Sequence, residues 1–393
     1  MRSVIQTYVD RQLPVYRQLA LDLHAHPEVC NTEFHACAVL SEQLRAEGFD
    51  VRTDIAGHPT GFTGVYRSAK PGPVLAFLAE YDALPGLGHA CGHNLFGPTS
   101  LLAASALRQV IDEAGGEIRV YGTPGEEGGE NGAAKVDYVR AGLFADVDAA
   151  LCVHPGDKHQ ASSKNLACAP MDLEFFGRSA HAAAAPEQGI NALDALILTY
   201  NGLNALRQHV TADVRIHGVI THGGVFPNIV PDYAAGKFFF RAGTAPRLDD
   251  LLHRCEAVAE GAARMTGARY RMQPSQNRLD NMVPTPSFDA VYGRELALLG
   301  ETMLPMDDGC GIGSSDAGNV SQVIPTIQPT IFITDGPTPW HTEAAREAAR
   351  SEKGLASVGL GAKALALTAL DLILDPALMR QIKADHALAV AAQ

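Results

Sequence analysis

The stretch PVLAFLAEYDALP, residues 73–85, carries the pattern from which the fold can be worked out. It begins with an uninterrupted apolar run and ends in a polar segment, with Glu80 and Asp82, before a proline turn. A short apolar run that stops at a turn is typical of a strand buried on both faces, as in parallel sheets. The stretch therefore predicts a central strand whose carboxyl end carries acidic side chains.

The segments around this strand alternate between helix and strand. Residues 33–49 and 94–116 have helical patterns, and the second ends at a Gly-Gly pair. Residues 117–127 and 148–157 have short strand patterns that run into loops. This alternation predicts an α/β fold in which a mostly parallel sheet is covered by helices on both faces.

The order of the predicted helices and strands changes near residue 170. Between residues 171 and 267 the order becomes strand, helix, strand, strand, helix, which suits a small α+β unit with an antiparallel sheet. The earlier alternation resumes after residues 276–286. We therefore predict one domain made of residues 1–169 and 282–393, with residues 170–281 inserted into it as a second domain.

The composition is that of a globular protein, because 46 % of the 393 residues are apolar and 19 % are charged. The formal net charge of −13, without a basic cluster, argues against nucleic acid as a partner. The most apolar stretch, residues 359–376, is interrupted by Lys363 and Asp371. We therefore expect a buried helix there and no role at a membrane.

The cysteines and the N-terminal segment indicate the cellular compartment of the protein. The seven cysteines are odd in number and irregularly spaced, which favours reduced thiols over a disulfide framework. Residues 1–20 have scattered charges and no continuous apolar core, unlike a signal peptide. We expect a cytoplasmic protein.

Side chains that bind metals recur where the predicted strands end. In an open α/β sheet, ligands collect beyond the carboxyl ends of the strands. A single His or Cys at such a place is more often packed or solvated than a ligand, so the recurrence carries the argument. Thiolate, imidazole and carboxylate together suit Zn, Mn, Co or Ni better than Ca or Mg. The residues at these ends are Glu80 and Asp82, Cys91 and His93, Glu126 and Glu127, His154, and His341.

The segment PGEEGG, residues 124–129, holds two adjacent carboxylates between glycines. Adjacent side chains face one site only if the backbone turns there, and the glycines permit the turn. One carboxylate could then bind metal while the other takes a proton from water. A solvated acidic loop is the alternative, and the segment alone favours it.

Taken together, these residues resemble those of a known family of co-catalytic metallopeptidases and amidohydrolases. The family includes carboxypeptidase G, aminoacylase, hippurate hydrolase, the plant indoleacetyl-amino-acid hydrolases and aminobenzoyl-glutamate hydrolase. The chain is most similar to the amidohydrolases that have a Cys ligand, particularly those like aminobenzoyl-glutamate hydrolase. The motifs that carry the resemblance are HAHPE (24–28), AEYDALPGLGHACGHN (79–94), GTPGEEGG (122–129), GRSAHAAAAPEQGINA (177–192), GGVFPNIVP (223–231), GSSDAGNVSQVIP (313–325) and WHTEAA (340–345).

The resemblance implies a site for two divalent metal ions in each subunit. It makes Glu126 the general base and Asp82 the residue that orients a ligand, whereas His89 is expected to be a loop residue. Glu80 stands where the peptidase branches have a His, and Asn94 stands where many amidohydrolases have Asp. The metal ligands that the resemblance implies are Cys91, His93, Glu127, His154 and His341.

The resemblance also assigns roles to the insertion, as a lid and dimerisation domain. It implies that His181 stabilises the oxyanion in the partner subunit's active site, and that Asn228 and Arg241 hold the substrate's carbonyl or carboxylate. On sequence alone His181 could equally be a packed residue. Arg241 follows KFFF on an apolar strand, where an unpaired charge would be costly, so a partner or ligand is favoured. Ser315 and Asp316 lie in a family motif near the metal site, and a turn or capping function is an equal alternative.

The sequence therefore predicts a metal-dependent amidohydrolase. It would cleave an N-acyl or N-aroyl amino acid, or a dipeptide, with Glu126 as base, and would work as a homodimer through the lid domain on a small amide bearing a carboxylate. A deaminase acting on an aromatic amine is one alternative. A catalytically silent metal or ligand binder is another, and the presence of Glu126 disfavours it because binding alone needs no base.

Overall fold

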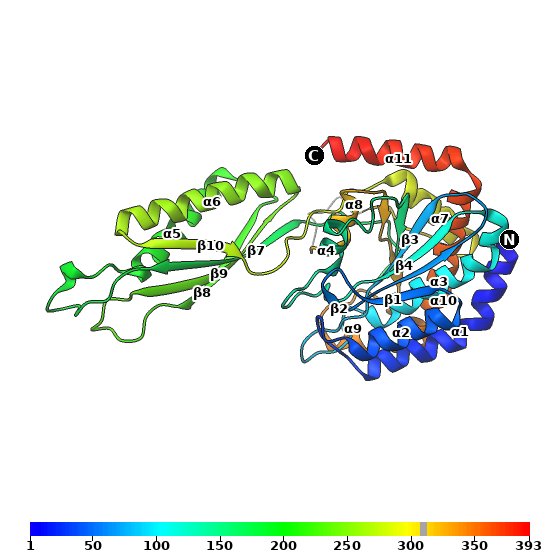
Figure 1. Cartoon of the computed structure of the whole chain (residues 1–393), viewed down its shortest axis with the longest axis horizontal. Coiled ribbons are helices and arrows are strands. Elements are labelled where there is room, and N and C mark those ends of the chain that lie inside the picture. Colours follow the sequence, from blue (N-terminus) through cyan, green and yellow to red (C-terminus); the bar gives the residue numbers. More distant parts are fainter. Residues whose placement is uncertain (307–312) are drawn as a thin grey trace. The chain divides into compact units, whose positions relative to one another are not determined.

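The computed structural model describes residues 1–306 and 313–393. The chain folds into two compact units (Figure 1). The first contains residues 1–164, 282–306 and 315–392, and the second contains residues 165–281 with 313, 314 and 393. The second unit is therefore inserted into the first.

The first unit is built on a six-stranded sheet with the order β1-β2-β4-β3-β5-β11. Strands β4, β3, β5 and β11 are parallel to one another, whereas β1 and β2 form an antiparallel edge. The predicted α/β class with a mostly parallel sheet is confirmed. The bounds are β1 (Asp50–Ile55), β2 (His58–Arg67), β3 (Val74–Ala79), β4 (Glu117–Gly122), β5 (Ala149–Leu151) and β11 (Thr326–Ile327). Two further strands, β6 (His154–Gly156) and β12 (Thr330–Phe332), pair in parallel.

Apolar side chains cover both faces of this sheet. Leu75 and Phe77 of β3 belong to one buried cluster, and Ala76 and Leu78 belong to another. Because successive side chains of a strand point to opposite faces, β3 is buried on both sides, as its apolar run predicts. The helices of this unit are α1 (Arg2–Ala25), α2 (Phe34–Ala46), α3 (His93–Ala114), α4 (Ala134–Arg140), α7 (Pro286–Leu298), α8 (Ala317–Ser321), α9 (Glu343–Ala348), α10 (Glu352–Leu374) and α11 (Pro376–Ala391).

Helix α10 packs against α3 and α1 inside the first unit. In the part of the chain that the structure describes, it is the one helix long and apolar enough to cross a membrane, and 78 % of its apolar window is buried in the protein. This burial agrees with the predicted core helix.

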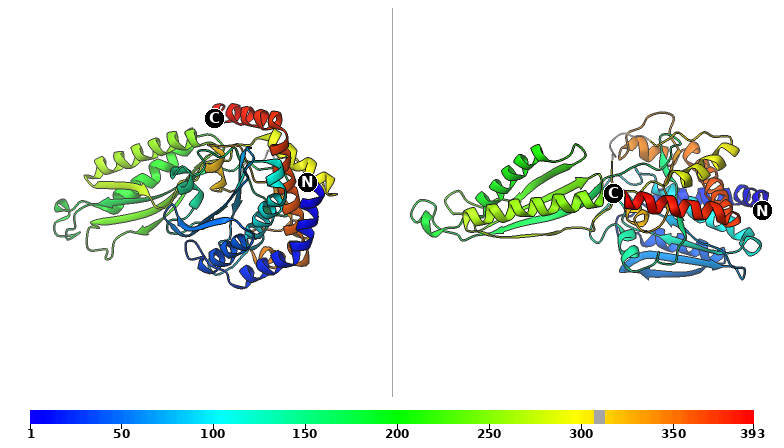
Figure 2. Two further views of the ribbon diagram at one scale, coloured as in Figure 1. Left: turned by 45° about the vertical axis from the view of Figure 1, so that its right-hand side comes forward. Right: turned by 90° about the horizontal axis from the view of Figure 1, so that it is seen from above.

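The second unit has a four-stranded antiparallel sheet with the order β10-β7-β9-β8. Helices α5 and α6 lie on the same face of this sheet, and their apolar side chains form its core (Figure 2). The Thr244 side chain accepts a hydrogen bond at the start of α6, and Gly267 ends the helix with a φ of +76°. The bounds are β7 (Ala167–Phe176), α5 (Ala192–Leu206), β8 (Arg215–His222), β9 (Tyr233–Ala242), α6 (Ala245–Thr266) and β10 (Arg269–Pro274).

Candidate metal centre

The predicted metal-binding side chains lie beyond the carboxyl ends of three parallel strands. Strand β3 ends at Ala79, just before Glu80 and Asp82, and β5 ends at Leu151, close to His154. Strand β4, which lies next to β3, leads into the loop with Glu126 and Glu127. Because parallel strands end at the same edge of a sheet, these loops are brought together.

Gly92 allows Cys91 and His93 to face the same site. Its φ is +80°, in the left-handed region that favours glycine, and helix α3 begins immediately after it. A Cβ at this position would lie 2.8 Å from Cβ of Pro155, the residue after His154. This close approach brings the Cys91 Sγ to 3.6 Å from Nε2 of His154.

His93 is fully buried, and its orientation is fixed by Asp82. Its Nδ1 lies 3.0 Å from the Asp82 carboxylate and 3.1 Å from the Asp82 carbonyl, both of which are acceptors. The proton therefore sits on Nδ1, and the lone pair of Nε2 is free to bind a metal. The other Asp82 oxygen accepts a hydrogen bond of 2.9 Å from the backbone N–H of Glu127. Asp82 thus orients two predicted ligands at once.

Glu127 and His341 form the more exposed side of the site. Nε2 of His341 lies 3.4 Å from Oε1 of Glu127. Burial raises the pKa of Glu127, but the interaction with His341 outweighs it and lowers the pKa to about 2. His341 has a φ of +60°, which is uncommon for a residue other than glycine. Such strain recurs at functional sites.

The donor atoms gather into overlapping groups, within each of which all atoms lie within 4.8 Å of one another. One group holds Cys91, His93 and His154, and a second holds Cys91, Glu127 and His341. Together these two groups contain the five ligands that the resemblance implies. A third group consists of Glu80, His93 and Glu126.

The chemistry of this donor set fits metal ions. Burial, followed by the negative charge of Glu127, raises the pKa of the Cys91 thiol, so a thiolate there needs a cation beside it. Within the described part of the chain, three buried atoms of the site have no hydrogen-bond partner: Oε2 of Glu80, Nε2 of His93 and Oε1 of Glu127. Buried polar atoms of native proteins are nearly always satisfied, and a metal would satisfy these.

Glu126 is half-buried next to this group. Burial raises its pKa well above the ordinary range, and the negative charges of Glu80 and Glu127 raise it further. Bound cations would oppose these effects. The preceding Gly125 has a φ of +70° and donates its N–H to the fully buried carboxylate of Glu33 at 2.9 Å. Glu33 thus holds the turn that the adjacent carboxylates require.

Sequence reasoning missed two buried residues of the site and left the role of a third, Asp316, open. Glu33 and Lys135 carry no motif, although a lysine within the apolar pattern of α4 is a signal in itself. Asp316 precedes α8 but makes no side-chain cap, and instead binds Lys135. Asn94 donates its amide to the carbonyl groups of Ala20 and Ala349, so it ties helices together.

The second unit contains the predicted oxyanion residue, His181, and the two predicted substrate-binding residues, Asn228 and Arg241. Nδ1 of the exposed His181 accepts hydrogen bonds from the N–H groups of Ala183 and Ala184, at 3.2 and 3.1 Å, so Nε2 carries the proton. The segment of Asn228 lies beside that of His181, because the Asn228 carbonyl accepts a bond from the N–H of Ala182.

Arg241 lies near the end of β9 in this unit. It donates a hydrogen bond of 2.8 Å to Oγ of Ser314, and its guanidinium lies 5.6 Å from the ring centre of Phe239. Among the described residues it forms no ion pair with a carboxylate, so its charge is available to an anionic ligand.

A family model for the peptidase dimerisation domain matches residues 165–265. An Xaa-Arg dipeptidase from Mus musculus is 37 % identical over 84 % of this chain and 78 % of the relative. The chain belongs to the M20 peptidase family. One of the chains of the p-aminobenzoyl-glutamate hydrolase of Escherichia coli K12 is 31 % identical, over 96 % of this chain and 92 % of the relative.

Solved structures of other proteins have the same fold. A putative aminohydrolase from methicillin-resistant Staphylococcus aureus superimposes with a TM-score of 0.77 at 20 % identity, over 95 % of this chain and all of that one. A dinuclear metal-binding M20 peptidase from Bacillus subtilis superimposes with a TM-score of 0.64 at 21 % identity, over 93 % and 99 % of the two chains. M20 enzymes typically depend on two metal ions, and this chain has groups of side chains that could hold them.

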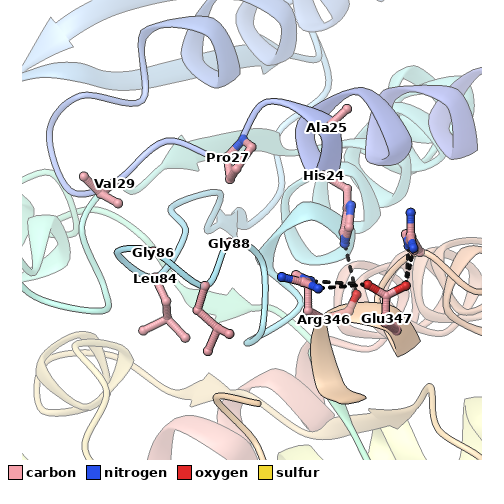
Figure 3. Close-up of a pocket in the computed structure, with 11 residues that line it drawn as sticks. His24, Ala25, Pro27, Val29, Leu84, Gly86, Gly88, Arg346 and Glu347 are labelled. Atoms are coloured by element: carbon pink, nitrogen blue, oxygen red, sulfur yellow. Dashed lines mark hydrogen bonds and ion pairs between the residues drawn. The ribbon is translucent and has the colours of Figure 1, made fainter. Parts of the chain in front are cut away.

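A pocket of about 530 Å³ in this M20 chain is lined partly by Leu84 and Gly88, in the loop that leads to Cys91 (Figure 3). Arg346 and Arg350 line it but are paired with Glu347, and Nε2 of His24 lies 3.0 Å from the Arg346 carbonyl. None of the five predicted ligands lines it. The pocket is therefore distinct from the metal centre.

The nearby His89 lies in a loop, as expected, but is buried, and burial lowers its pKa to about 3.

Proposed function

We propose that this protein is a metal-dependent amidohydrolase that cleaves a dipeptide or an N-acyl or N-aroyl amino acid. The observation that carries the proposal is the pair of donor groups sharing Cys91, with the carboxylate of Glu126 beside them. The names of its relatives support the substrate class, since they describe a dipeptidase and a hydrolase of aminobenzoyl-glutamate.

The metal ligands in this proposal are Cys91, His93, Glu127, His154 and His341, and they would hold two divalent ions of Mn, Zn, Co or Ni. Such ions polarise an amide carbonyl and make a bound water more acidic. Asp82 keeps the His93 imidazole in the tautomer that leaves Nε2 free. Glu126 takes a proton from the attacking water and passes it to the amine nitrogen as the carbon–nitrogen bond breaks.

The second unit supplies the substrate contacts in this proposal. His181, whose Nε2 carries the proton, donates a hydrogen bond to the oxyanion in the partner's active site. Arg241 and Asn228 bind the substrate carbonyl or its carboxylate. The match to a peptidase dimerisation domain supports a homodimer, as does edge strand β8, where Val219 and Ile220 are 61 % and 44 % exposed.

We assign the catalytic and dimerisation roles to the two domains with the boundaries predicted from the sequence. Residues 1–169 and 282–393 form the catalytic metal-binding domain, and residues 170–281 form the lid and dimerisation domain. The six cysteines in the described part of the chain are free thiols, which supports a cytoplasmic location.

The test is a substrate panel on the metal-free protein reloaded in turn with Mn, Zn, Co or Ni. We expect a dipeptide to release its two amino acids, and an N-aroyl amino acid to release the aromatic acid and the amino acid, in equal amounts. Their carboxamide forms should react more slowly. Glu126→Gln, loaded with the same metal, is the matched control and should be inactive. Release of ammonia without an amino acid would show a deaminase instead. Failure to cleave any amide with any of the four metals would refute the proposal.

A further inference from the structure

A fully buried lysine lies next to the metal centre. Lys135, near the start of α4, places its Nζ 2.9 Å from Oε1 of Glu80 and 2.5 Å from Oδ1 of Asp316. The backbone N–H of Lys135 also donates to the other Asp316 oxygen at 3.1 Å. All three side chains are inaccessible to solvent. Buried charges are costly unless they are paired, so such a cluster requires a reason.

The charges of this cluster do not cancel. Two carboxylates and one ammonium leave one net negative charge in the protein interior. Lys135 and, at 3.4 Å, the amide of Gln328 contact only Oε1 of Glu80. Its Oε2 is buried and lacks a hydrogen-bond partner within residues 1–306 and 313–393. A further cation next to this unpaired oxygen would neutralise the remaining negative charge.

Oε2 of Glu80 lies 3.2 Å from Nε2 of His93, without the geometry of a hydrogen bond. Nδ1 of His93 faces the Asp82 carboxylate, so Nε2 is the ring nitrogen that faces Glu80. Ligand atoms that lie about 2.0–2.2 Å from one ion are themselves roughly 3–3.5 Å apart. The separation of these two atoms therefore suits two neighbouring ligands of one metal ion.

We propose that Glu80 is a further ligand of the ion held by His93, and that Lys135, itself held by Asp316, positions it by binding its other oxygen. The inference rests on the metal centre of the proposed function and extends it. The resemblance implies five ligands and gives Glu80 no role, whereas the third donor group places Glu80 beside His93 and Glu126. Lys135 is a positioning residue in this arrangement, because it acts only through Glu80.

The alternative is a proton on Nε2 of His93, which would give an ion pair between His93 and Glu80 without any metal contact. The two cases predict different effects of removing Glu80 on the affinity for metal. If Glu80 is a ligand, its removal weakens metal binding. If Glu80 pairs with a protonated His93, its removal frees a ligand nitrogen, and metal binding stays equal or becomes stronger.

The test measures metal binding directly, with a chromophoric chelator competing for Zn or Mn, and with metal content after dialysis. Glu80→Gln should lower the affinity for one of the two ions at least tenfold, in line with the effect of disturbing metal-site residues. Asp316→Asn is the matched control, because it also removes one carboxylate from Lys135, and it should change the affinity less. Glu80→Asp serves if Glu80→Gln does not fold, since it keeps the charge but withdraws the oxygen.

A double-mutant cycle tests the role of Lys135. Lys135→Met should weaken metal binding in the native background but have no further effect in Glu80→Gln. Melting of the metal-free variants checks that they are folded. Unchanged affinity of Glu80→Gln for both ions would overturn the assignment while leaving the proposed function intact. A native protein that binds no metal would overturn both.

Discussion

Asp289 is a buried carboxylate of α7 whose partner is Ser162 and not the metal centre. Its Oδ1 accepts hydrogen bonds from the backbone N–H and the hydroxyl of Ser162, at 2.9 and 2.6 Å. Burial outweighs these bonds and raises its pKa from 3.8 to about 6. The folded protein thus binds a proton more tightly than the unfolded chain does. The associated stability is fully present below about pH 3.8 and is lost as the pH rises through about 6.

Asp289→Asn should therefore stabilise the protein at neutral pH. The amide keeps an oxygen for Ser162 but carries no charge. At pH 8 we expect a gain of about 1–3 kcal/mol in the free energy of unfolding, and near pH 4 almost none. Urea unfolding of the metal-free native and variant proteins at both pH values measures this. An equal effect at both pH values would contradict the expected link to ionisation.

Single residues of the site differed in how far sequence could predict them. The resemblance implies that Asp82 orients a ligand that it does not specify, and the structure places Oδ1 of Asp82 3.0 Å from Nδ1 of His93, in the same motif. The clustering of Lys135 with Glu80 and Asp316 could not be predicted, because these residues are far apart in the chain and only the folded sheet brings them together. Long-range pairing of buried charges leaves no local pattern in a sequence.

At the scale of elements, the turn between Cys91 and α3 depends on a glycine. Gly92 and Gly86 lie in one loop, with φ of +80° and +71°, but only Gly92 is crowded, by Pro155. An alanine at either position costs about 1–2 kcal/mol because of the left-handed backbone. At position 92 its Cβ would also push Pro155, and with it His154, out of place.

We expect Gly92→Ala to lose metal affinity and thermal stability, whereas the matched variant Gly86→Ala should lose only a little stability. Metal content and melting temperature of the two purified proteins measure the difference. Equal metal content in both variants would show that the contact with Pro155 does not shape the centre.

The elements with apolar runs were predictable, and the edge strands were not. Strand β3 is a continuous apolar run that ends in its functional loop, as residues 73–85 predict. Strands β1 and β10 are mostly exposed, and polar or charged residues fill most of their positions. Without a buried face, an edge strand has no strong periodic signal. Strands β1 and β10 were therefore absent from the predicted order.

At the scale of the whole molecule, the proposed dimer makes a prediction about edge strand β8. Val219→Lys should place a charge on this edge and shift the protein from dimer to monomer. Leu298→Lys is the control, since Leu298 of α7 is similarly exposed, at 72 %, but lies in the other unit. Sedimentation of both variants at equal concentration measures the change. A Val219→Lys protein that remains as dimeric as the control would exclude β8 from the interface.

The proposed role of His181 in the partner's site can be tested by mixing two inactive proteins. Glu126→Gln lacks the base, and His181→Ala lacks the oxyanion donor. After joint unfolding and reassembly about half of the dimers should be mixed, and each should contain one intact site, so about a quarter of all sites should work. Activity near zero, with mixed dimers confirmed by mass, would show that His181 serves its own subunit.

The insertion of one unit into the other also sets an order of events during synthesis. The second unit is almost continuous, from residue 165 to 281, whereas α1 and α3 need α10 as a packing partner. At ribosomal rates of about 5–20 residues per second, α10 follows α3 by roughly ten to fifty seconds. During that interval α10 is not yet available to cover the apolar faces of α1 and α3, whereas the inserted unit can already fold. The nascent chain should therefore depend on chaperones over this interval.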